Sequence, residues 1–248
     1  MRIVSWNCYR GACLDRAERL AHLAPDIAVI QECAQPAPAS SGGRAVWFGK
    51  NPRQGVGVVA RPPYAVAPGP VDETLDHTAF PAIISGPVSF HLLAIWALPR
   101  PTYVRAMLGA LETYADFLRD APSVVIGDFN CFAEWQGKAP SKHHVDLAHL
   151  LRDELALVSA YHSAPAYDPS VPEAPTYFFR WKEKHPFHID YCFVPAAWRW
   201  AIRSVSVRPF DEATWQSDHR PVIVELDLPM SSSARGNARS ARRVSSRS

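Results

Sequence analysis

The chain has 248 residues, of which 48% are hydrophobic and 20% are charged, and its mean hydropathy is −0.13. This length and composition allow one large buried core and exclude a wholly disordered chain. No run of roughly 18 or more apolar residues is available to span a membrane, and no signal segment is evident at the N-terminus. We therefore expect a soluble protein of the cytoplasm, and we expect a monomer.

The net charge of +2 is unevenly distributed along the chain. Residues 230–248, MSSSARGNARSARRVSSRS, hold five arginines and no acid; the remaining 21 basic residues face 24 acidic ones, a charge of −3 for the rest. A segment rich in Ser and Arg lacks the apolar residues that offset ordering entropy. We expect a folded domain over 1–229 and a disordered tail over 230–248, which either contacts phosphates without sequence preference or is simply solvated.

Apolar runs rich in β-branched residues predict strands along the whole chain. They cover residues 3–6, 27–31, 56–60, 90–96, 124–127, 177–179, 189–194, 202–207 and 222–226. Helical periodicity predicts helices at 15–23, 103–118 and 147–155. Because strands and helices do not alternate with regular βαβ spacing, this order favours an α/β protein in which sheets pack together with helices outside.

The five cysteines are odd in number, scattered, and without CxxC spacing, which argues against a disulfide framework or a structural zinc site. They are Cys8, Cys13, Cys33, Cys131 and Cys192. Strand alternation points three of them away from the polar residues beside them. We expect reduced, buried thiols.

Residues 124–131, VVIGDFNC, place a charge and an amide directly after a buried strand. Side chains in an extended segment alternate between faces, so Asp128 and Asn130 can point the same way while Phe129 points to the other side. Gly127 lets the backbone pass close to a neighbour or a ligand. The pair fits either an oxygen-rich cluster or an ordinary turn, since Asp and Asn both favour turns.

Similar placements recur at other strand ends. The polar residues next to apolar runs are Asn7, Glu32, Asp128, Asn130, Asp190, Asp218 and His219. Strand ends on one edge of a sheet converge, and convergent carboxylates repel one another unless a cation or protons offset their charge. Oxygen donors without a His/Cys cluster favour Mg²⁺, with Mn²⁺ also suitable, over zinc. The pattern therefore predicts a site for a hard divalent cation.

Five motifs in order carry a family resemblance: NC at 7, QE at 31, GDFN at 127, HIDY at 188 and SDHRP at 217. Together they resemble the endonuclease/exonuclease/phosphatase superfamily, which includes abasic-site endonucleases, pancreatic-type deoxyribonucleases, inositol polyphosphate phosphatases and neutral sphingomyelinases. The resemblance spans residues 2–228. It implies a four-layer α/β sandwich, in which two mainly antiparallel β-sheets pack face to face with helices outside.

The resemblance also implies roles for the matching residues. Glu32 would be the principal metal carboxylate, with Asn7 beside it and Asp218 as a further ligand. The catalytic group would comprise Asp128, Asn130, Asp190 and His219. Asp128 would orient and deprotonate a water that Asn130 helps to hold, and Asp190 would fix the tautomer of His219.

One position departs from the family pattern. Members commonly have His or Tyr at the end of the strand that precedes the long central helix, in contact with the scissile phosphate, and this chain has Trp96 there. Trp offers one N–H donor and no titratable proton. His188, two residues before Asp190, either compensates for this loss or is only packed beside the site.

Two loops near the expected mouth, residues 131–144 and 178–188, interleave aromatic and basic residues. Trp135, Arg180 and Trp181 suit stacking on bases and pairing with phosphates, although solvated loops with packed aromatic stems would look the same. The leading hypothesis is a Mg²⁺-dependent phosphoesterase, a nuclease acting on single-stranded or locally opened nucleic acid. The alternatives are a phosphatase or phosphodiesterase for small or lipid phosphates, and a catalytically silent module that binds nucleic acid or a partner.

Overall fold

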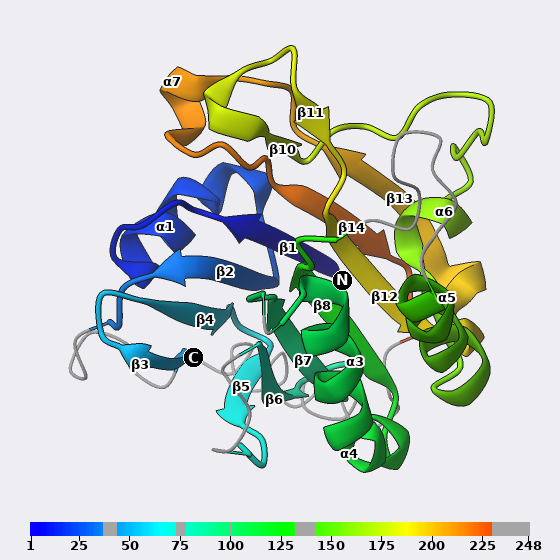
Figure 1. Ribbon diagram of the computed structural model, residues 1–248. Coiled ribbons are helices and arrows are strands. Elements are labelled where there is room, and N and C mark those ends of the chain that lie inside the picture. Colours follow the sequence, from blue (N-terminus) through cyan, green and yellow to red (C-terminus); the bar gives the residue numbers. More distant parts are fainter. Residues whose placement is uncertain (37–43, 73–77, 100, 132–141, 230–248) are drawn as a thin grey trace, which may run out of the picture.

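Two six-stranded sheets form the centre of the computed structural model, which describes residues 1–36, 44–72, 78–99, 101–131 and 142–229 (Figure 1). The first sheet has the order β13 (Ile202–Val207), β14 (Val222–Leu226), β1 (Arg2–Asn7), β2 (Ile27–Cys33), β4 (Gln54–Ala60) and β3 (Ala45–Asn51). The second has the order β5 (Ala65–Pro68), β6 (Ala79–Ser85), β7 (Phe90–Trp96), β8 (Ser123–Asp128), β12 (Asp190–Pro195) and β9 (Leu157–Ser159). A small hairpin of β10 (Tyr177–Phe178) and β11 (Pro186–Phe187) stands apart from both.

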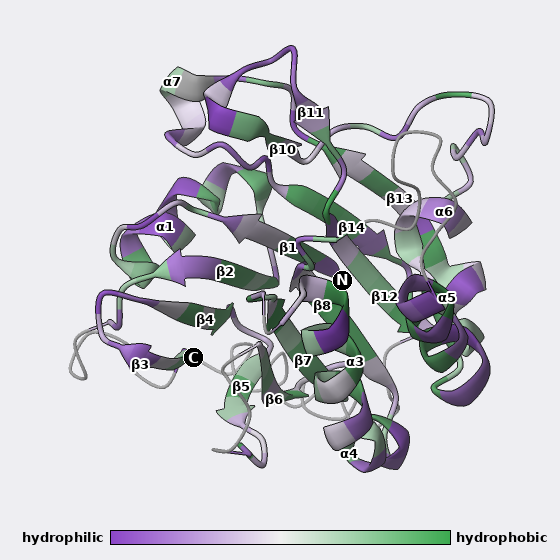
Figure 2. Ribbon diagram, in the orientation of Figure 1, coloured by the Kyte–Doolittle hydropathy of each residue, from purple (hydrophilic) through white to green (hydrophobic). Residues whose placement is uncertain are grey.

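The pairing within both sheets is mainly antiparallel. The exceptions among the paired strands are β1 with β2 and β7 with β8, which run parallel. The two sheets face each other across a core of aliphatic and aromatic side chains, among them Val29, Phe80, Leu92 and Val224. Figure 2 shows the hydrophobic colouring concentrated on the strands, with hydrophilic residues on the outward faces of the helices.

Helices cover the outer faces of the sheets. On the first sheet lie α1 (Cys13–Arg19) and the short η1 (Ala21–Leu23). On the second lie α3 (Tyr103–Thr113), α4 (Ala115–Asp120), α5 (Lys142–His149) and the π-helical η2 (Leu150–Glu154). Shorter elements are α6 (Ala160–Ser163), η3 (Phe179–Trp181), η4 (Ala196–Ala201) and α7 (Glu212–Trp215). The predicted four-layer α/β sandwich is therefore confirmed.

Several element boundaries differ from the sequence-based expectations. The helix predicted at 103–118 is two helices, because Tyr114 leaves helical geometry with φ −94° and ψ 13°. The strand predicted at 177–179 has only two residues and continues into η3. Strands β3, β5, β6, β9 and β11 lie outside the strands expected from the sequence. β6 contains Pro81 in its interior, and proline normally argues against a paired strand.

The topology brings polar strand ends to one edge of the sandwich. β1 and β2 run parallel and therefore end at the same edge, while β14 is antiparallel to β1 and begins there. In the second sheet β8 ends at Asp128, directly opposite Asp190 at the start of antiparallel β12.

Within the described part of the chain, no helix has the length and apolarity needed to cross a membrane. The expected tail, 230–248, lies outside the described residues.

Candidate active site

Asn7 links two carboxylates that come from different sheets. Its Nδ2 donates to Glu32 Oε1 at 3.1 Å and to Asp128 Oδ2 at 3.0 Å. Its own Oδ1 accepts the backbone N–H of Tyr9 at 3.1 Å, and the side chain is buried. Asn7 thus holds both carboxylates in place as a hydrogen-bond donor, beside Glu32 as the family resemblance implies.

Glu32 owes its direction to a β-bulge. The register between β2 and β4 shifts between Gln31 and Cys33, and Glu32 has a left-handed φ of 60°. Such bulges redirect a side chain at the end of a strand and are frequent near functional sites. The redirected carboxylate is half-buried, and Gln54 Nε2 donates to its second oxygen at 3.0 Å. The sequence analysis did not predict this hydrogen bond from Gln54 to Glu32.

Asp128 sits where β8 leaves the sheet. Gly127 precedes it with φ +147°, and a Cβ added there would lie 2.0 Å from the carbonyl oxygen of Ile95. Only glycine lets β8 approach β7 this closely at that point. Asp128 Oδ1 accepts the backbone N–H of Asn130 at 2.9 Å, and Oδ2 accepts Asn130 Nδ2 at 3.0 Å. Asp128 and Asn130 therefore share one side, while Phe129 packs into the core on the other. The shared side comes from a turn and not from strand alternation, because Asn130 lies beyond the end of β8 and has a left-handed φ of 48°.

Asp190 and His219 form a buried pair beside Asp128. His219 Nδ1 donates to Asp190 Oδ2 at 2.9 Å, and His219 Nε2 lies 3.9 Å from Asp128 Oδ2. Thr176 Oγ1 accepts the backbone N–H of Asp190 at 3.1 Å and so fixes the start of β12. Ser217 Oγ accepts the backbone N–H of His219 and donates to the carbonyl oxygen of Asn7, which ties the histidine to β1.

The two acids and the histidine control one another's protonation. Burial disfavours the charged imidazole, but the charges of Asp190 and Asp128 and the hydrogen bond with Asp190 outweigh it and raise the pKa of His219 to about 10. Burial raises the pKa of Asp128 to about 7, with a further rise from Asp190 and opposition from His219, Asn7 and Asn130. Both shifts favour the protonated forms of His219 and Asp128.

The residues present fit a hard divalent cation on the Glu32 side of this group. Burial raises the pKa of the Asp218 carboxyl against the opposing charge of His219, and the charges of Glu32 and Asp190 add to the rise, so these acidic groups lie close enough to interact. A second group of potential ligand atoms, one from each of three buried residues, lies within 4.8 Å of one another; the residues are Asp128, Asp190 and His219. Carboxylate oxygens are the donors that a hard cation prefers, so Glu32 and Asp218, the ligands that the family resemblance implies, have the right chemistry for it.

The five residues expected to bind substrate have different placements. Trp96 is opposite Asp128 in the β7–β8 register and packs against the core between the sheets. His188 lies before β12; its Nδ1 bonds to the carbonyl oxygen of Ala174 at 2.6 Å and its ring contacts Tyr161 and Tyr191. This packing does not favour compensation for Trp96. Arg180 and Trp181 lie in η3 at the mouth, and Trp135 is outside the described residues.

Two tyrosines at the site were missed by sequence reasoning. The ring of Tyr177 lies 4.6 Å from that of His219, centroid to centroid. Burial, followed by the charges of Asp218 and Asp128, raises the pKa of Tyr177 to about 12. Burial and the charge of Asp128 also raise the pKa of Tyr103, at the start of α3. Both phenols therefore keep their protons at neutral pH next to the carboxylates.

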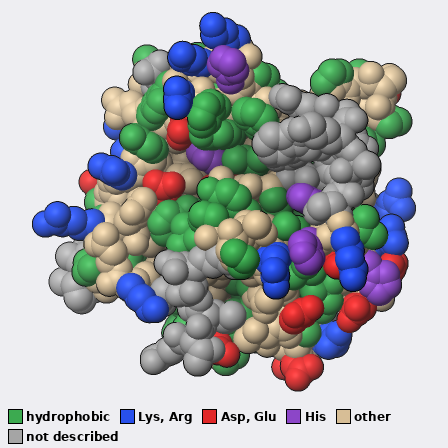
Figure 3. All heavy atoms as spheres, in the orientation of Figure 1, with side chains coloured by type: hydrophobic (Ala, Val, Ile, Leu, Met, Phe, Trp, Pro, Cys, Tyr) green, Lys and Arg blue, Asp and Glu red, His purple; other side chains and the backbone are tan. Residues whose placement is uncertain are grey.

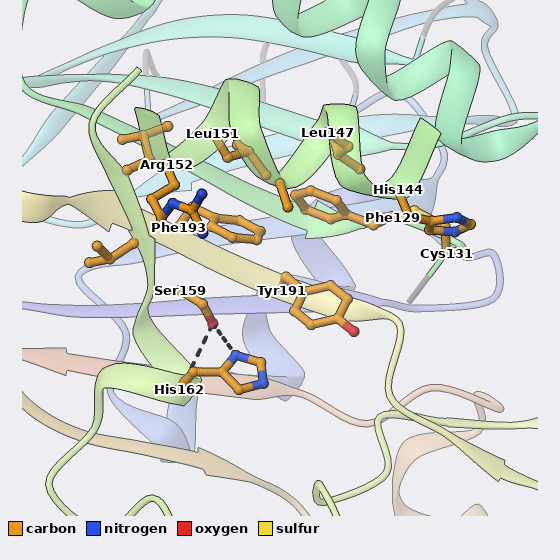
Figure 4. Close-up of a pocket in the computed structure, with 13 residues that line it drawn as sticks. Phe129, Cys131, His144, Leu147, Leu151, Arg152, Ser159, His162, Tyr191 and Phe193 are labelled. Carbon is orange, nitrogen blue, oxygen red and sulfur yellow. Dashed lines mark hydrogen bonds between the residues drawn. The ribbon is translucent and has the colours of Figure 1, made fainter. Parts of the chain in front are cut away.

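A separate apolar cavity of about 440 Å³ lies beside β8 and β12, on the face of these strands opposite to Asp128 and Asp190 (Figure 4). Phe129 and Tyr191, the chain neighbours of Asp128 and Asp190, line it together with Leu147 and Leu151 from the covering helices. Cys131 also lines this cavity, and all five cysteines are free and buried, as predicted. The acidic site and the cavity thus lie on opposite faces of the strand pair β8 and β12.

Comparisons with known proteins agree with this architecture. The profile of the Endonuclease/Exonuclease/phosphatase family matches residues 4–219. The 3′-5′ exonuclease NExo from Neisseria meningitidis is 22% identical, with a TM-score of 0.68 over 92% of this chain and 100% of that one. The endonuclease domain of TRAS1, a telomere-specific non-LTR retrotransposon, is 18% identical, with a TM-score of 0.65 over 92% of this chain and 98% of that one.

A second structure of NExo from Neisseria, described as a 3′ phosphatase bound to a product DNA hairpin, is 23% identical with a TM-score of 0.68 over 92% of this chain and 100% of that one. No curated protein matches the sequence. The profile match covers most of the chain, and the two mixed sheets have the arrangement of these structures. The chain therefore belongs to the Endonuclease/Exonuclease/phosphatase family.

Proposed function

We propose that this protein is a metal-dependent nuclease that hydrolyses phosphodiester bonds of nucleic acid. The observation that carries the proposal is the continuous set of contacts from Glu32 through Asn7 to Asp128, with the buried Asp190–His219 pair beside it. This set combines anionic oxygens, a carboxylate that titrates near neutral pH and a protonated imidazole within one site. Phosphoester hydrolysis needs these three kinds of group.

Glu32 and Asp218 would hold the cation, with Mg²⁺ preferred because the donors are oxygens. When bound, it would offset negative charge on the phosphate and on the leaving oxygen. Asn7 and Gln54 keep the Glu32 carboxylate oriented by donating to its two oxygens.

Asp128 is suited to act as the general base. Its pKa of about 7 lets it accept a proton from an attacking water near neutral pH, where general bases are most effective. Asn130 and Asn7 donate to its oxygens and so fix the direction of the remaining lone pairs. His219 carries a proton on each ring nitrogen; one is held by Asp190, and the other is directed to the side of Asp128, where it can stabilise a phosphate oxygen.

Tyr177 and Tyr103 supply further hydrogen-bond donors for the phosphate. Their raised pKa values keep the hydroxyl groups protonated at neutral pH. In this proposal they contribute the phosphate contact that a His or Tyr at the position of Trp96 would make. Both hydroxyls act as neutral donors and take no part in proton transfer.

Nucleic acid is favoured over small phosphate esters by the described activities of structural neighbours. They are an exonuclease, an endonuclease domain and a phosphatase bound to a DNA hairpin. Figure 3 shows Lys and Arg side chains above and to the left of acidic and histidine side chains that lie between the β10–β11 hairpin and the β1–β2 side of the first sheet. Cationic groups on one side of an acidic centre suit a polyanion that must present one phosphate to a metal.

The experiment is a substrate comparison with the wild-type protein and Glu32→Gln. Single- and double-stranded DNA, RNA, a 3′-phosphorylated oligonucleotide and small phosphate esters are incubated with Mg²⁺, with Mn²⁺ and with a chelator. We expect oligonucleotide cleavage that needs the metal and falls at least about a hundredfold in Glu32→Gln, because a neutral amide is a poor partner for a hard cation. Glu112→Gln, at an exposed position of α3, is the matched control.

Full cleavage by Glu32→Gln, or in excess chelator, would contradict the metal-dependent mechanism. Turnover of small esters or of the 3′-phosphate without cleavage of internal bonds would replace the nuclease by a phosphatase. Binding of oligonucleotides without any turnover would identify a silent binding module.

A further inference from the structure

Two loops from distant parts of the chain meet beside the acidic site. Tyr9 follows β1, and Trp181 belongs to η3; their rings make an edge-to-face contact with centroids 5.2 Å apart. Tyr9 is connected to the site because its backbone N–H donates to Asn7 Oδ1. The η3 turn is connected to it because Phe178 N donates to the carbonyl oxygen of Asp218 at 2.8 Å. The aromatic pair is therefore anchored to two residues of the site.

The surface around this pair is exposed and cationic. Tyr9 is 42% exposed and Phe179 is 44% exposed, high values for large aromatic side chains. The guanidinium of Arg10 lies 5.7 Å from the ring centre of Tyr9, and that of Arg180 lies 5.1 Å from the ring centre of Phe179. Exposed rings interleaved with arginines suit nucleobases and phosphates, because bases stack on rings and phosphates pair with guanidinium groups.

Backbone strain marks the same two loops. Tyr9, Arg10, Arg180 and Trp181 all have left-handed φ values, of 49°, 89°, 54° and 59°. Non-glycine residues seldom adopt this conformation, and such residues cluster where a ligand is held. The left-handed residues of both loops are those at the aromatic contact, so this backbone conformation directs the rings of Tyr9 and Trp181 toward each other beside the acidic site.

We propose that Tyr9 and Trp181 form a stacking site for an unpaired nucleobase of the nucleotide next to the scissile phosphate. The proposal rests on the nuclease function proposed above and specifies its substrate as single-stranded or frayed nucleic acid. Arg10 and Arg180 contact the flanking phosphates. The base stacks on the exposed aromatic surface while its phosphate reaches the acidic site. A small phosphate ester without a base gains nothing from this surface.

The test uses oligonucleotides of one length and sequence in which a tetrahydrofuran abasic residue replaces one nucleotide at a time around the cleaved bond. For the wild-type protein, kcat/KM in Mg²⁺ should fall about tenfold at one flanking position, in the range that single stacked bases contribute. In Tyr9→Leu and in Trp181→Leu the ratio between base-containing and abasic substrates at that position should fall towards one. Leucine keeps apolar volume at the contact, so the loops remain packed.

Two further variants separate stacking from other effects. Tyr9→Phe retains the ring and should keep the wild-type ratio. Trp200→Leu is the matched control, because Trp200 is 69% exposed in η4, which follows the end of β12 opposite to the site. Thermal unfolding of each variant confirms that it is folded.

The possible outcomes distinguish this proposal from the one on which it rests. Metal-dependent cleavage that is equally fast with and without the base at every position would overturn the stacking site and leave the nuclease intact. An equal loss on base-containing and abasic substrates in the leucine variants would assign the pair a structural role only. Absence of oligonucleotide cleavage under all metal conditions would overturn both proposals.

Discussion

Replacing Asp190 by Asn should move the alkaline limit of activity to lower pH. Asp190 raises the pKa of His219 through its charge and through the 2.9 Å hydrogen bond to Nδ1. Asparagine removes the carboxylate charge and with it the charge-assisted character of the hydrogen bond, while burial continues to disfavour the imidazolium. The expected consequence is a histidine that loses its proton within the working pH range.

The size of the shift follows from the geometry of the pair. Both side chains are buried, and a hydrogen bond between charged groups contributes about 1.5–3 kcal/mol. Since one pKa unit corresponds to about 1.4 kcal/mol, the pKa of His219 should fall by about 1–2 units. The alkaline limb would then move from near the wild-type pKa of about 10 to about 8–9.

Stability provides an independent measure of the same change. The native pKa of His219 lies above its ordinary value of 6.5, so the stabilisation from the pair is complete below pH 6.5 and is lost as the pH rises through about 10. The difference in the free energy of unfolding between wild type and Asp190→Asn should be about 1.5–3 kcal/mol at pH 6 and should shrink towards pH 10. Asp116→Asn, at an exposed position of α4, should show no such trend.

The assay is a pH–rate profile of kcat/KM for oligonucleotide cleavage, measured together with urea unfolding at the same pH values. An unchanged alkaline limb in Asp190→Asn, in a protein that unfolds at lower urea concentration, would refute a protonated His219 in the reaction. A pH-independent difference in unfolding free energy would refute the linkage between the two groups.

Two further predictions concern Gly127 and Tyr177. Gly127→Ala should lower the free energy of unfolding by more than about 2 kcal/mol in urea titrations, because φ is +147° and the new Cβ would clash with the Ile95 carbonyl. The control is Gly109→Ala, where a Cβ meets nothing within 4 Å and which should be neutral or stabilising. Equal losses of unfolding free energy in the two variants would contradict this reasoning. Tyr177→Phe should lower kcat/KM about tenfold with little change in melting temperature, since the ring still packs on His219; undiminished cleavage would exclude its hydroxyl as a phosphate donor.

The sequence alone predicts much of this arrangement. The apolar run ahead of Asp128 and the glycine before it give the correct strand end. The shared side of Asp128 and Asn130 comes from a turn with a left-handed Asn130, the ordinary turn that these residue types also favour. The five ordered motifs give the fold through family resemblance. The other polar residues at strand ends come together at one edge of the sandwich, and this follows once the parallel and antiparallel strand pairings are known.

Other features depend on contacts that no local pattern encodes. The left-handed bulge at Glu32 arises from a register shift with β4, and the direction of the Asn7 amide is set by Tyr9 and two distant carboxylates. Tyr103 and Tyr177 look like ordinary core tyrosines in the sequence, since only the tertiary structure brings them to Asp128. The packing of His188 against tyrosines likewise depends on loops whose path is not periodic.

The pairing of β14 with β1 has a consequence for how the protein acquires activity during folding. The hydrogen bond between Ser217 and Asn7 spans 210 residues, so Asn7 and the segment of His219 meet only after β1 and β14, the first and last strands of the chain, have paired. Contacts of such long sequence separation form late and slowly, because loop closure must precede them. The proposed active site can therefore be complete only after the segment around His219 has been synthesised and β14 has paired with β1.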